Sequence, residues 1–310
     1  MCLIALALDQ SRRFPLVVAA NRDEFYARPA ARLAWWTPDA GGQAILGGRD
    51  LEAGGTWLGL TTQGRLAMLT NVRDPSRTDA QAPSRGQIVP QWLSGTEPTD
   101  RFWMRTALSG YNGFNLIAAD FKRGECFWAS NRHAHPVRLE RGTYGVSNAS
   151  LNTAWPKTTT LQQRLHAAID DADSVDALAS ELFTALGDRQ CAADAELPAT
   201  GIPLDLERAL SAAFIRVPER QYGTRCSTLV ISERVGRSMV THVLERSYTA
   251  SGAVALLRQA TLKHWPPRYS DDSPSVPVEQ AVVSDGPRTR VRSLLKPALT
   301  PRRAARRAVP

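Results

Sequence analysis

The chain has 310 residues, of which 43% are hydrophobic, so it can bury a substantial core and is not a disordered protein. Of its 38 basic residues, eight lie between Gly286 and Pro310 without any acidic residue, and the remaining 30 equal the 30 acidic residues. The body is therefore neutral and has no basic stripe with interleaved aromatic residues, which argues against specific nucleic-acid binding. The Pro- and Arg-rich segment 286–310 is predicted to be a disordered tail.

The four cysteines, Cys2, Cys126, Cys191 and Cys226, are widely separated and form no CxxC pair. This spacing favours neither a disulfide framework nor a structural metal site, and it fits a reducing, cytoplasmic setting. The apolar run at 14–20 ends at Asn21, too soon for a usual signal peptide. Because no run of about 18 apolar residues occurs elsewhere, no transmembrane segment is predicted.

Residues 2–8 and 14–20 are two apolar runs separated by the polar residues 9–13, a pattern that predicts a β-hairpin. In an antiparallel hairpin, the start of the first strand lies beside the end of the second. We therefore expect Cys2 to lie close to the segment 21–24.

Later hairpins are predicted over 56–60 with 65–71, 115–119 with 126–129, and 228–232 with 238–244. Helical periodicity covers 98–109, 158–169, and 174–186, where Ser174 can cap and Gly187 can end the helix. Another helix is predicted over 253–263. Strands thus bracket a helical middle, the order of an α+β protein with antiparallel sheets covered by helices. The pattern weakens beyond about residue 245, so we expect a main domain over 1–246 and an extension over 247–285.

Cys2 would become the first residue if Met1 were removed, and it would then carry a thiol and a free amine together. An α-amine titrates near pKa ~7.7–8.0 and a thiol near ~8.5, so the amine can accept the thiol proton. One residue would supply both the nucleophile and the general base. The alternative interpretation is that Cys2 fills an apolar position of its strand.

Five polar residues stand at the ends of predicted strands or in turns near them: Arg22, Asp23, Asn71, Asn148 and Arg225. A sheet would bring such residues to a common site. Each also has a simpler explanation, because asparagine is common in turns and the arginine and aspartate can form a surface ion pair.

Taken together, eight short motifs resemble the NRDE family, the transport and Golgi organisation family, from residue 1 to about 246. They are Met1-Cys2, Asn21-Arg22-Asp23-Glu24, Gly47-Gly48-Arg49-Asp50, Gly54-Gly55-Thr56-Trp57-Leu58-Gly59, Leu69-Thr70-Asn71-Val72-Arg73, Tyr144-Gly145-Val146-Ser147-Asn148, Trp155-Pro156-Lys157 and Tyr222-Gly223-Thr224-Arg225. Two departures are visible: the stretch 152–156 differs from the usual Asp-Thr-Pro-Trp-Pro, and Cys226 stands where a serine is expected. Neither affects the candidate nucleophile.

The resemblance implies an N-terminal-nucleophile hydrolase-like fold, a four-layer αββα sandwich of two antiparallel sheets between helices. It is also similar, more distantly, to cysteine amidases such as penicillin V acylase and bile salt hydrolase. It implies these roles: Cys2 as nucleophile and base, Arg22 and Asp23 holding its amine and thiolate, Asn71 offering an N–H to the oxyanion, Asn148 near the amine or substrate, and Arg225 adding positive charge at the floor of the site.

Two functions stay open at this point. The first is hydrolysis of a small-molecule, non-peptide amide through an acyl-enzyme on Cys2, which requires no cofactor. The second, implied by the same family, is haem binding or haem trafficking without hydrolysis. The histidines form no recognised haem motif. The sequence predicts neither a metal site nor an oligomeric state.

Overall fold

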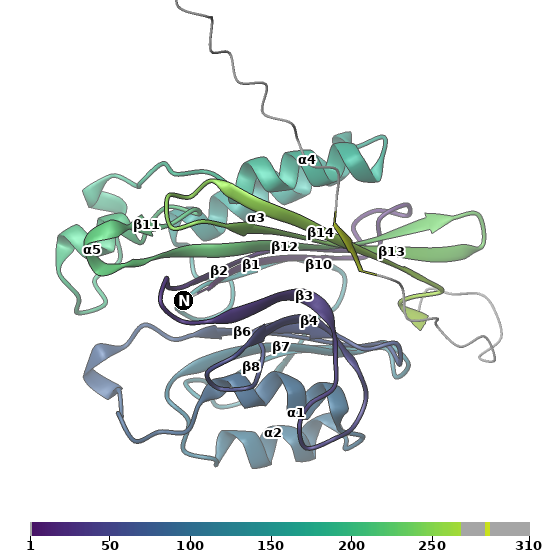
Figure 1. The fold of residues 1–310 in the computed structure, drawn as a ribbon, viewed down its shortest axis with the longest axis horizontal. Helices are drawn as coiled ribbons and strands as arrows, with labels where there is room; N and C mark the ends of the chain where they lie inside the picture. Colours follow the sequence, from purple (N-terminus) through teal and green to yellow (C-terminus); the bar gives the residue numbers. More distant parts are fainter. Residues whose placement is uncertain (1, 268–282, 286–310) are drawn as a thin grey trace, which may run out of the picture.

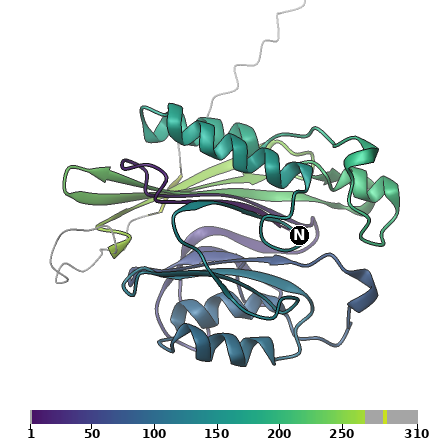
Figure 2. The same cartoon turned by 180° about the vertical axis from the view of Figure 1, so that it is seen from behind.

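The computed structural model describes residues 2–267 and 283–285. Two β-sheets lie face to face, and helices cover the outer face of each, which gives four layers in the order αββα (Figures 1 and 2). The strand pairs in the described residues are antiparallel. The predicted α+β sandwich of two antiparallel sheets is therefore confirmed.

Within the described residues, the first sheet has eight strands in the order β10-β1-β2-β12-β13-β14-β15, with β11 also beside β12. Their bounds are β1 (Cys2–Leu8), β2 (Leu16–Phe25), β10 (Gly142–Val146), β11 (Arg216–Val217), β12 (Tyr222–Val235), β13 (Ser238–Tyr248), β14 (Val254–Lys263) and β15 (Ser284–Asp285). The helices α3 (Pro156–Asp171) and α4 (Val175–Leu186) pack on its outer face, and α5 (Leu204–Ala209) lies near one end (Figure 1).

The second sheet, in the part of the chain that the structure describes, has seven strands in sequence order. They are β3 (Ala30–Trp36), β4 (Ile45–Asp50), β5 (Leu58–Leu60), β6 (Arg65–Asn71), β7 (Phe114–Asp120), β8 (Glu125–Ser130) and β9 (Val137–Arg138). The helices α1 (Ile88–Ser94) and α2 (Thr99–Ala107) pack on its outer face.

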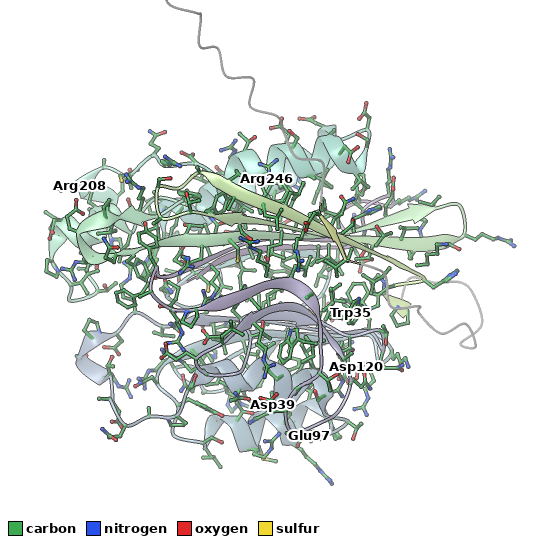
Figure 3. The ribbon with its side chains drawn as sticks, viewed as in Figure 1. Trp35, Asp39, Glu97, Asp120, Arg208 and Arg246 are labelled. Carbon is green, nitrogen blue, oxygen red and sulfur yellow. The ribbon has the colours of Figure 1, made fainter. Side chains whose placement is uncertain are left out.

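The alternation of side chains along β1 connects the sequence to the layers. Ile4, Leu6 and Leu8 belong to the core between the sheets, whereas Leu3 and Ala5 pack against α3 and α4. The strand is buried on both faces, which explains why it is apolar without interruption. Side chains fill the space between the sheets, where Trp35 packs against the same core (Figure 3).

The predicted hairpins and the helices at 98–109, 158–169 and 174–186 are confirmed, with shifted ends. The Ser174 hydroxyl accepts a hydrogen bond from the Ala177 N–H and caps α4, as predicted. The helix predicted over 253–263 is wrong, because β14 occupies Val254–Lys263 and pairs with β13. The extension from 247 therefore begins as part of the first sheet. The predicted tail at 286–310 and the fate of Met1 lie outside the described residues.

Among residues 2–267 and 283–285, none of the helices combines the length and the apolar character that a membrane-spanning segment requires.

Candidate functional site

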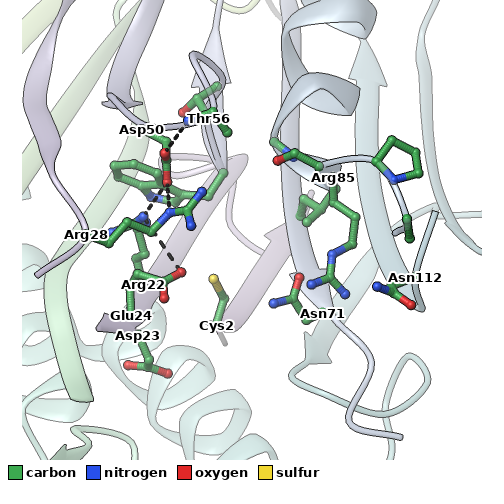
Figure 4. A pocket seen from close by; sticks show the side chains of 17 residues that line it. Cys2, Arg22, Asp23, Glu24, Arg28, Asp50, Thr56, Asn71, Arg85 and Asn112 are labelled. Carbon is green, nitrogen blue, oxygen red and sulfur yellow. Dashed lines mark hydrogen bonds and ion pairs between the residues drawn. The ribbon is translucent and has the colours of Figure 1, made fainter. Parts of the chain in front are cut away.

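A cavity of about 250 Å³ lies where the ends of β1, β2 and β6 meet (Figure 4). Cys2 lies inside it, with Arg22 on one side and Asn71 on the other (Figure 4). It is lined by Cys2, Arg22, Asp23, Glu24, Arg28, Asp50, Ala53, Thr56, Trp57, Leu69, Asn71, Ala82, Pro83, Ser84, Arg85, Gly86 and Asn112. Four of the six residues predicted from the sequence thus share one cavity: Cys2, Arg22, Asp23 and Asn71.

The register of the first hairpin brings the nucleophile candidate to this cavity. Cys2 pairs with Arg22 across β1 and β2, in the same register that pairs Leu6 with Val18 in the core. Paired residues in an antiparallel sheet point to the same face. Cys2 and Arg22 therefore both point into the space between the sheets, and the prediction that Cys2 lies near segment 21–24 is confirmed.

The Cys2 thiol is almost fully buried, and its carbonyl oxygen accepts a hydrogen bond of 3.0 Å from the Ser147 hydroxyl. Burial raises the pKa of the thiol above its ordinary value, although the Arg22 guanidinium and a hydrogen bond from the Asp23 backbone act to lower it. With Met1 still attached, the thiol is therefore protonated at neutral pH. A nucleophile in this position needs a base beside it.

Arg22 is held rigidly by two neighbours. Its Nη2 donates to Asp50 Oδ2 at 2.9 Å, and its guanidinium carbon lies 4.4 Å from the ring centroid of Trp57. Arg28 donates to the same Asp50 oxygen at 2.7 Å. Burial acts to raise the pKa of Asp50, but the hydrogen bonds from Arg28 and the Ala53 N–H outweigh it, so the net pKa is lowered. Asp50 is therefore an ionised anchor for both arginines.

Two glycines of the sequence motifs shape this wall by close approach. A Cβ on Gly48 would lie 2.3 Å from the Trp57 ring, so only glycine leaves room for the indole that covers Arg22. A Cβ on Gly55 would lie 1.9 Å from the Gly86 carbonyl oxygen, which accepts a hydrogen bond from the Thr56 N–H at 3.1 Å. This second contact brings the loop that carries Arg85 against the cavity.

Asn71 ends β6, and its side chain lines the cavity opposite Arg22 (Figure 4). Asn148 lies behind it rather than in the cavity lining. The Asn148 Nδ2 donates to the Asn71 carbonyl oxygen at 2.8 Å, and the Ser147 hydroxyl donates to Asn148 Oδ1 at 3.2 Å. The single Ser147 hydroxyl hydrogen is shared between Asn148 Oδ1 and the Cys2 carbonyl oxygen, so a chain of hydrogen bonds links Asn71 to Cys2 across the two sheets.

Asp23 borders the cavity, but its carboxylate points to the opposite face of the first sheet, toward Lys157 of α3. Its Oδ1 accepts a hydrogen bond of 2.7 Å from the Thr224 hydroxyl. Burial raises the pKa of Asp23, and the charge of Lys157 acts against that rise. Lys157 is itself buried, which lowers its pKa to about 8, and its Nζ donates to the Leu210 carbonyl at 2.9 Å. A buried cation thus stabilises the aspartate beneath Cys2.

The sequence did not predict Lys157 as a site residue, although Lys157 lies in the motif Trp155-Pro156-Lys157, which belongs to the family resemblance. Arg85 was missed as well, and no motif pointed to it. Asp50 lies in the motif Gly47-Gly48-Arg49-Asp50, but the sequence predicts no role for it.

Arg225, the sixth predicted residue, does not line the cavity. It lies in a β-bulge of β12, where Thr224 pairs with Asp23 and Cys226 pairs with Arg22. Its Nη1 donates to the carbonyl oxygens of Phe25, Tyr26 and Arg28 at 2.7, 2.9 and 3.3 Å. Arg225 therefore anchors the turn that carries Arg28.

The cavity lining does not fit haem well. It contains three arginines and three carboxylates, whereas sites for large cofactors are mostly apolar. Its described residues include no histidine, methionine or tyrosine, so of the usual axial ligands of haem only a cysteine, Cys2, is present among them. Haem binding stays a prediction that no feature of this cavity favours. No group of three or more His, Cys, Asp or Glu side chains within 2–267 and 283–285 is arranged to hold a metal ion.

Solved structures with some likeness to this chain include a mutant of the conjugated bile acid hydrolase from Clostridium perfringens, with 10% identity, 76% of this chain and 90% of that chain covered, and a TM-score of 0.42. Another is the N-acylethanolamine-hydrolyzing acid amidase ortholog of Caenorhabditis elegans, with 11% identity, coverage of 74% and 92%, and a TM-score of 0.34. Both TM-scores are low, so these likenesses carry no weight for function.

Curated relatives are much more similar in sequence. The Transport and Golgi organization protein 2 homolog of Bos taurus is 35% identical over 81% of this chain and 94% of its own length. The human homolog is 32% identical, with coverage of 86% and 97%, and the Drosophila melanogaster protein is 25% identical, with coverage of 80% and 93%. The family model for Transport and Golgi organisation 2 matches residues 1–250. This chain therefore belongs to the Transport and Golgi organisation 2 family, as the motifs around Cys2 and Asn21–Glu24 predicted.

Proposed function

We propose that this protein is a cysteine hydrolase of the N-terminal-nucleophile type, which cleaves a non-peptide amide bond through an acyl-enzyme on Cys2. One observation carries the proposal: the Cys2 thiol, the Arg22 guanidinium and the Asn71 amide surround a single cavity of about 250 Å³. These are the groups that acyl transfer needs, namely a nucleophile, a fixed positive charge and a hydrogen-bond donor for an oxyanion.

The chemistry begins when Met1 is removed, because Cys2 then gains a free α-amine next to its thiol. The amine takes the thiol proton, and the sulfur attacks the amide carbon. The carbonyl oxygen becomes an oxyanion, to which Asn71 donates a hydrogen bond. The amine then gives the proton to the leaving nitrogen, the C–N bond breaks, and an acyl-thioester remains on Cys2. Water, deprotonated by the same amine, attacks the thioester, releases the acid and restores the thiol.

The surrounding charges support this use of the amine. An α-amine that accepts a proton becomes a cation in a buried place, where an uncompensated charge is costly. Asp23 is the nearby carboxylate that can stabilise it, and Lys157 favours the ionised form of Asp23. The raised pKa of the Cys2 thiol makes a neighbouring base necessary, since little thiolate forms without one.

Thiol alkylation tests the proposal before any substrate is known. Cys126 and Cys226 are buried, whereas Cys191 is exposed and competes for the reagent, so the experiment uses the Cys191→Ser variant. We expect intact-mass analysis to find Met1 absent, and peptide mapping after a limiting dose of iodoacetamide to find the label on Cys2. A protein that retains Met1, or a Cys2 that reacts no faster than Cys126 and Cys226, would overturn the mechanism.

A further inference from the structure

Arg85 is the one cation of the cavity lining that no described carboxylate contacts within ion-pair distance. Arg22 and Arg28 both pair with Asp50, at 2.9 and 2.7 Å. The Arg85 side chain makes one hydrogen bond to the described residues, from Nη1 to the Gly113 carbonyl oxygen at 2.9 Å. A guanidinium has five donor hydrogens in a planar fork, so most of its capacity stays unused by the described residues.

The position of Arg85 is costly unless an anion joins it. It is partly buried, and burial lowers its pKa, while Glu24 acts on it electrostatically from farther away in the cavity. Glu24 is nearer to Arg22, at 3.9 Å between Nη2 and Oε2, and its other oxygen accepts a hydrogen bond from the Phe25 N–H. A desolvated guanidinium without a partner has lost its hydrogen bonds to water. A carboxylate that accepts two hydrogen bonds from the guanidinium replaces them.

The neighbours of Arg85 leave its free side facing the cavity. Arg85 is the first residue of the short 3₁₀ helix Arg85–Gln87 that precedes α1. It extends toward Asn71 and Asn112, across the cavity from Arg22 (Figure 4). The Asn112 amide is already engaged, because its Oδ1 accepts from the Asp79 N–H and its Nδ2 donates to the Asp79 carbonyl, both at 2.8 Å. Among the described residues on this side of the cavity, Arg85 is therefore the one that offers a ligand a positive charge.

We infer that Arg85 is the anion-binding residue of the cavity, and that the amide substrate carries a carboxylate, which Arg85 holds while the scissile carbonyl lies at Cys2. This inference rests on the proposed hydrolase function and adds the substrate class to it. The cavity of about 250 Å³ accommodates the amide and the carboxylate close together. Arginine is suited to the task because its fork matches the two oxygens of a carboxylate.

A matched pair of small probes tests this inference without turnover. N-acetylglycine carries an amide and a carboxylate, and N-acetylglycinamide is nearly the same size but neutral. The background is full-length Cys2→Ala protein, which has no side-chain nucleophile at this position, and ligand binding is read from the rise in the thermal unfolding midpoint at increasing probe concentration. We expect N-acetylglycine to bind roughly tenfold more tightly than N-acetylglycinamide, the scale of one charge-assisted hydrogen bond.

Arg85→Met should remove that preference, while Arg101→Met, which deletes an exposed arginine of α2 outside the cavity, should keep it. If Arg85→Met does not fold, Arg85→Gln tests the same loss of charge and keeps a donor for the Gly113 carbonyl. Equal binding of the two probes, or a preference that survives in the Arg85 variant, would overturn the inference. The alkylation experiment on Cys2 reports on the hydrolase mechanism separately, so either idea can fail alone.

Discussion

The space between the two sheets has an apolar end and a charged end, and the same two strands supply both. At the hairpin end of β1 and β2, Leu8 pairs with Leu16 within the core, and at the other end Cys2 pairs with Arg22 in the cavity. The pairing register is the same throughout, and only the side chains change. The residues that stabilise the core and the residues that line the cavity therefore lie at opposite ends of the same strand face. A substitution at one end can change the stability of the fold and leave the chemistry of the cavity unchanged, or the reverse.

Cys2→Ala should have the largest effect and should act only at the charged end. We expect the rate of acyl-enzyme formation to fall at least about 10⁴-fold, since no other group replaces the nucleophile. The free energy of unfolding should change by about 1 kcal/mol or less, because one small buried group is lost. Mass spectrometry of the acyl-enzyme, formed with an amide that the unsubstituted protein hydrolyses, measures the acylation rate. Urea unfolding measures the free energy of unfolding. Residual acylation of the variant would mean that the nucleophile lies elsewhere.

Leu6→Ala is the matched change at the apolar end, on the same face of β1. Leu6 is 1% exposed, and its truncation should lower the free energy of unfolding by about 2–5 kcal/mol. The Cys2 alkylation rate of the folded fraction should stay unchanged. A large drop in that rate would show that the two ends of the strand are coupled rather than separate.

Asn71→Ala tests the wall opposite Arg22. If its side-chain amide donates to the oxyanion, kcat should fall by about 10²–10³, the usual cost of losing one such donor. The KM should change little, because the donor acts mainly on the transition state. Stability should be nearly unchanged, since the hydrogen bond from Asn148 goes to the Asn71 backbone. A normal kcat would assign the oxyanion to another donor, such as a backbone N–H.

Lys157→Met should produce an effect on stability that depends on pH. Because the pKa of Lys157 is lowered from 10.5 to about 8 by burial, the unfolded chain holds a proton across this window that the folded protein has released. The folded protein therefore gains stability as pH rises through the window, by up to about 1.4 kcal/mol per pH unit. The variant lacks this gain. Its Asp23 carboxyl also loses a stabilising cation, so the ionised form of Asp23, which prevails at high pH, lowers the stability of the variant further.

Urea unfolding at several pH values across that window measures the difference between the unsubstituted protein and Lys157→Met. The advantage of the unsubstituted protein should grow with pH. Parallel stability profiles would contradict the burial of a titrating Lys157 beneath Cys2.

Local patterns predicted the part of the site that one hairpin builds. The apolar runs on either side of residues 9–13 sufficed to place Cys2 beside Arg22, because an antiparallel hairpin leaves little choice of register once its strands and turn are known. Asp9 has a φ of 53° in this turn, a conformation that aspartate adopts more readily than most residues.

The segment Val254–Lys263 shows where local patterns fail. Seven of its ten residues are leucine, alanine, arginine or glutamine, which are good helix formers, yet it forms β14. Pairing with β13 and burial of Ala260 and Leu262 at a spacing of two residues determine its conformation. Tertiary contacts of this kind override propensity and are invisible within an eleven-residue window.

Arg85 and Lys157 could not be placed from the sequence for a related reason. Each reaches the site from a different layer, one from a loop held by the contact of Gly55 with Gly86 and the other from the first turn of α3. The role of Arg85 depends on the absence of a carboxylate partner among the described residues. The role of Lys157 depends on its position near the buried Asp23. Family motifs pointed to Lys157 without indicating its charge environment.

The bulge at Arg225 has a consequence for insertions and deletions. Thr224 pairs with Asp23 and Cys226 pairs with Arg22, which are consecutive residues of β2. Strand β12 would make the same pairs on both sides of the bulge if Arg225 were absent. Arg225 is therefore an extra residue that the sheet accommodates without a change of register. A chain from which it was deleted would keep the alignment of Cys226 with Arg22 and would lose the three-carbonyl anchor that fixes the turn carrying Arg28.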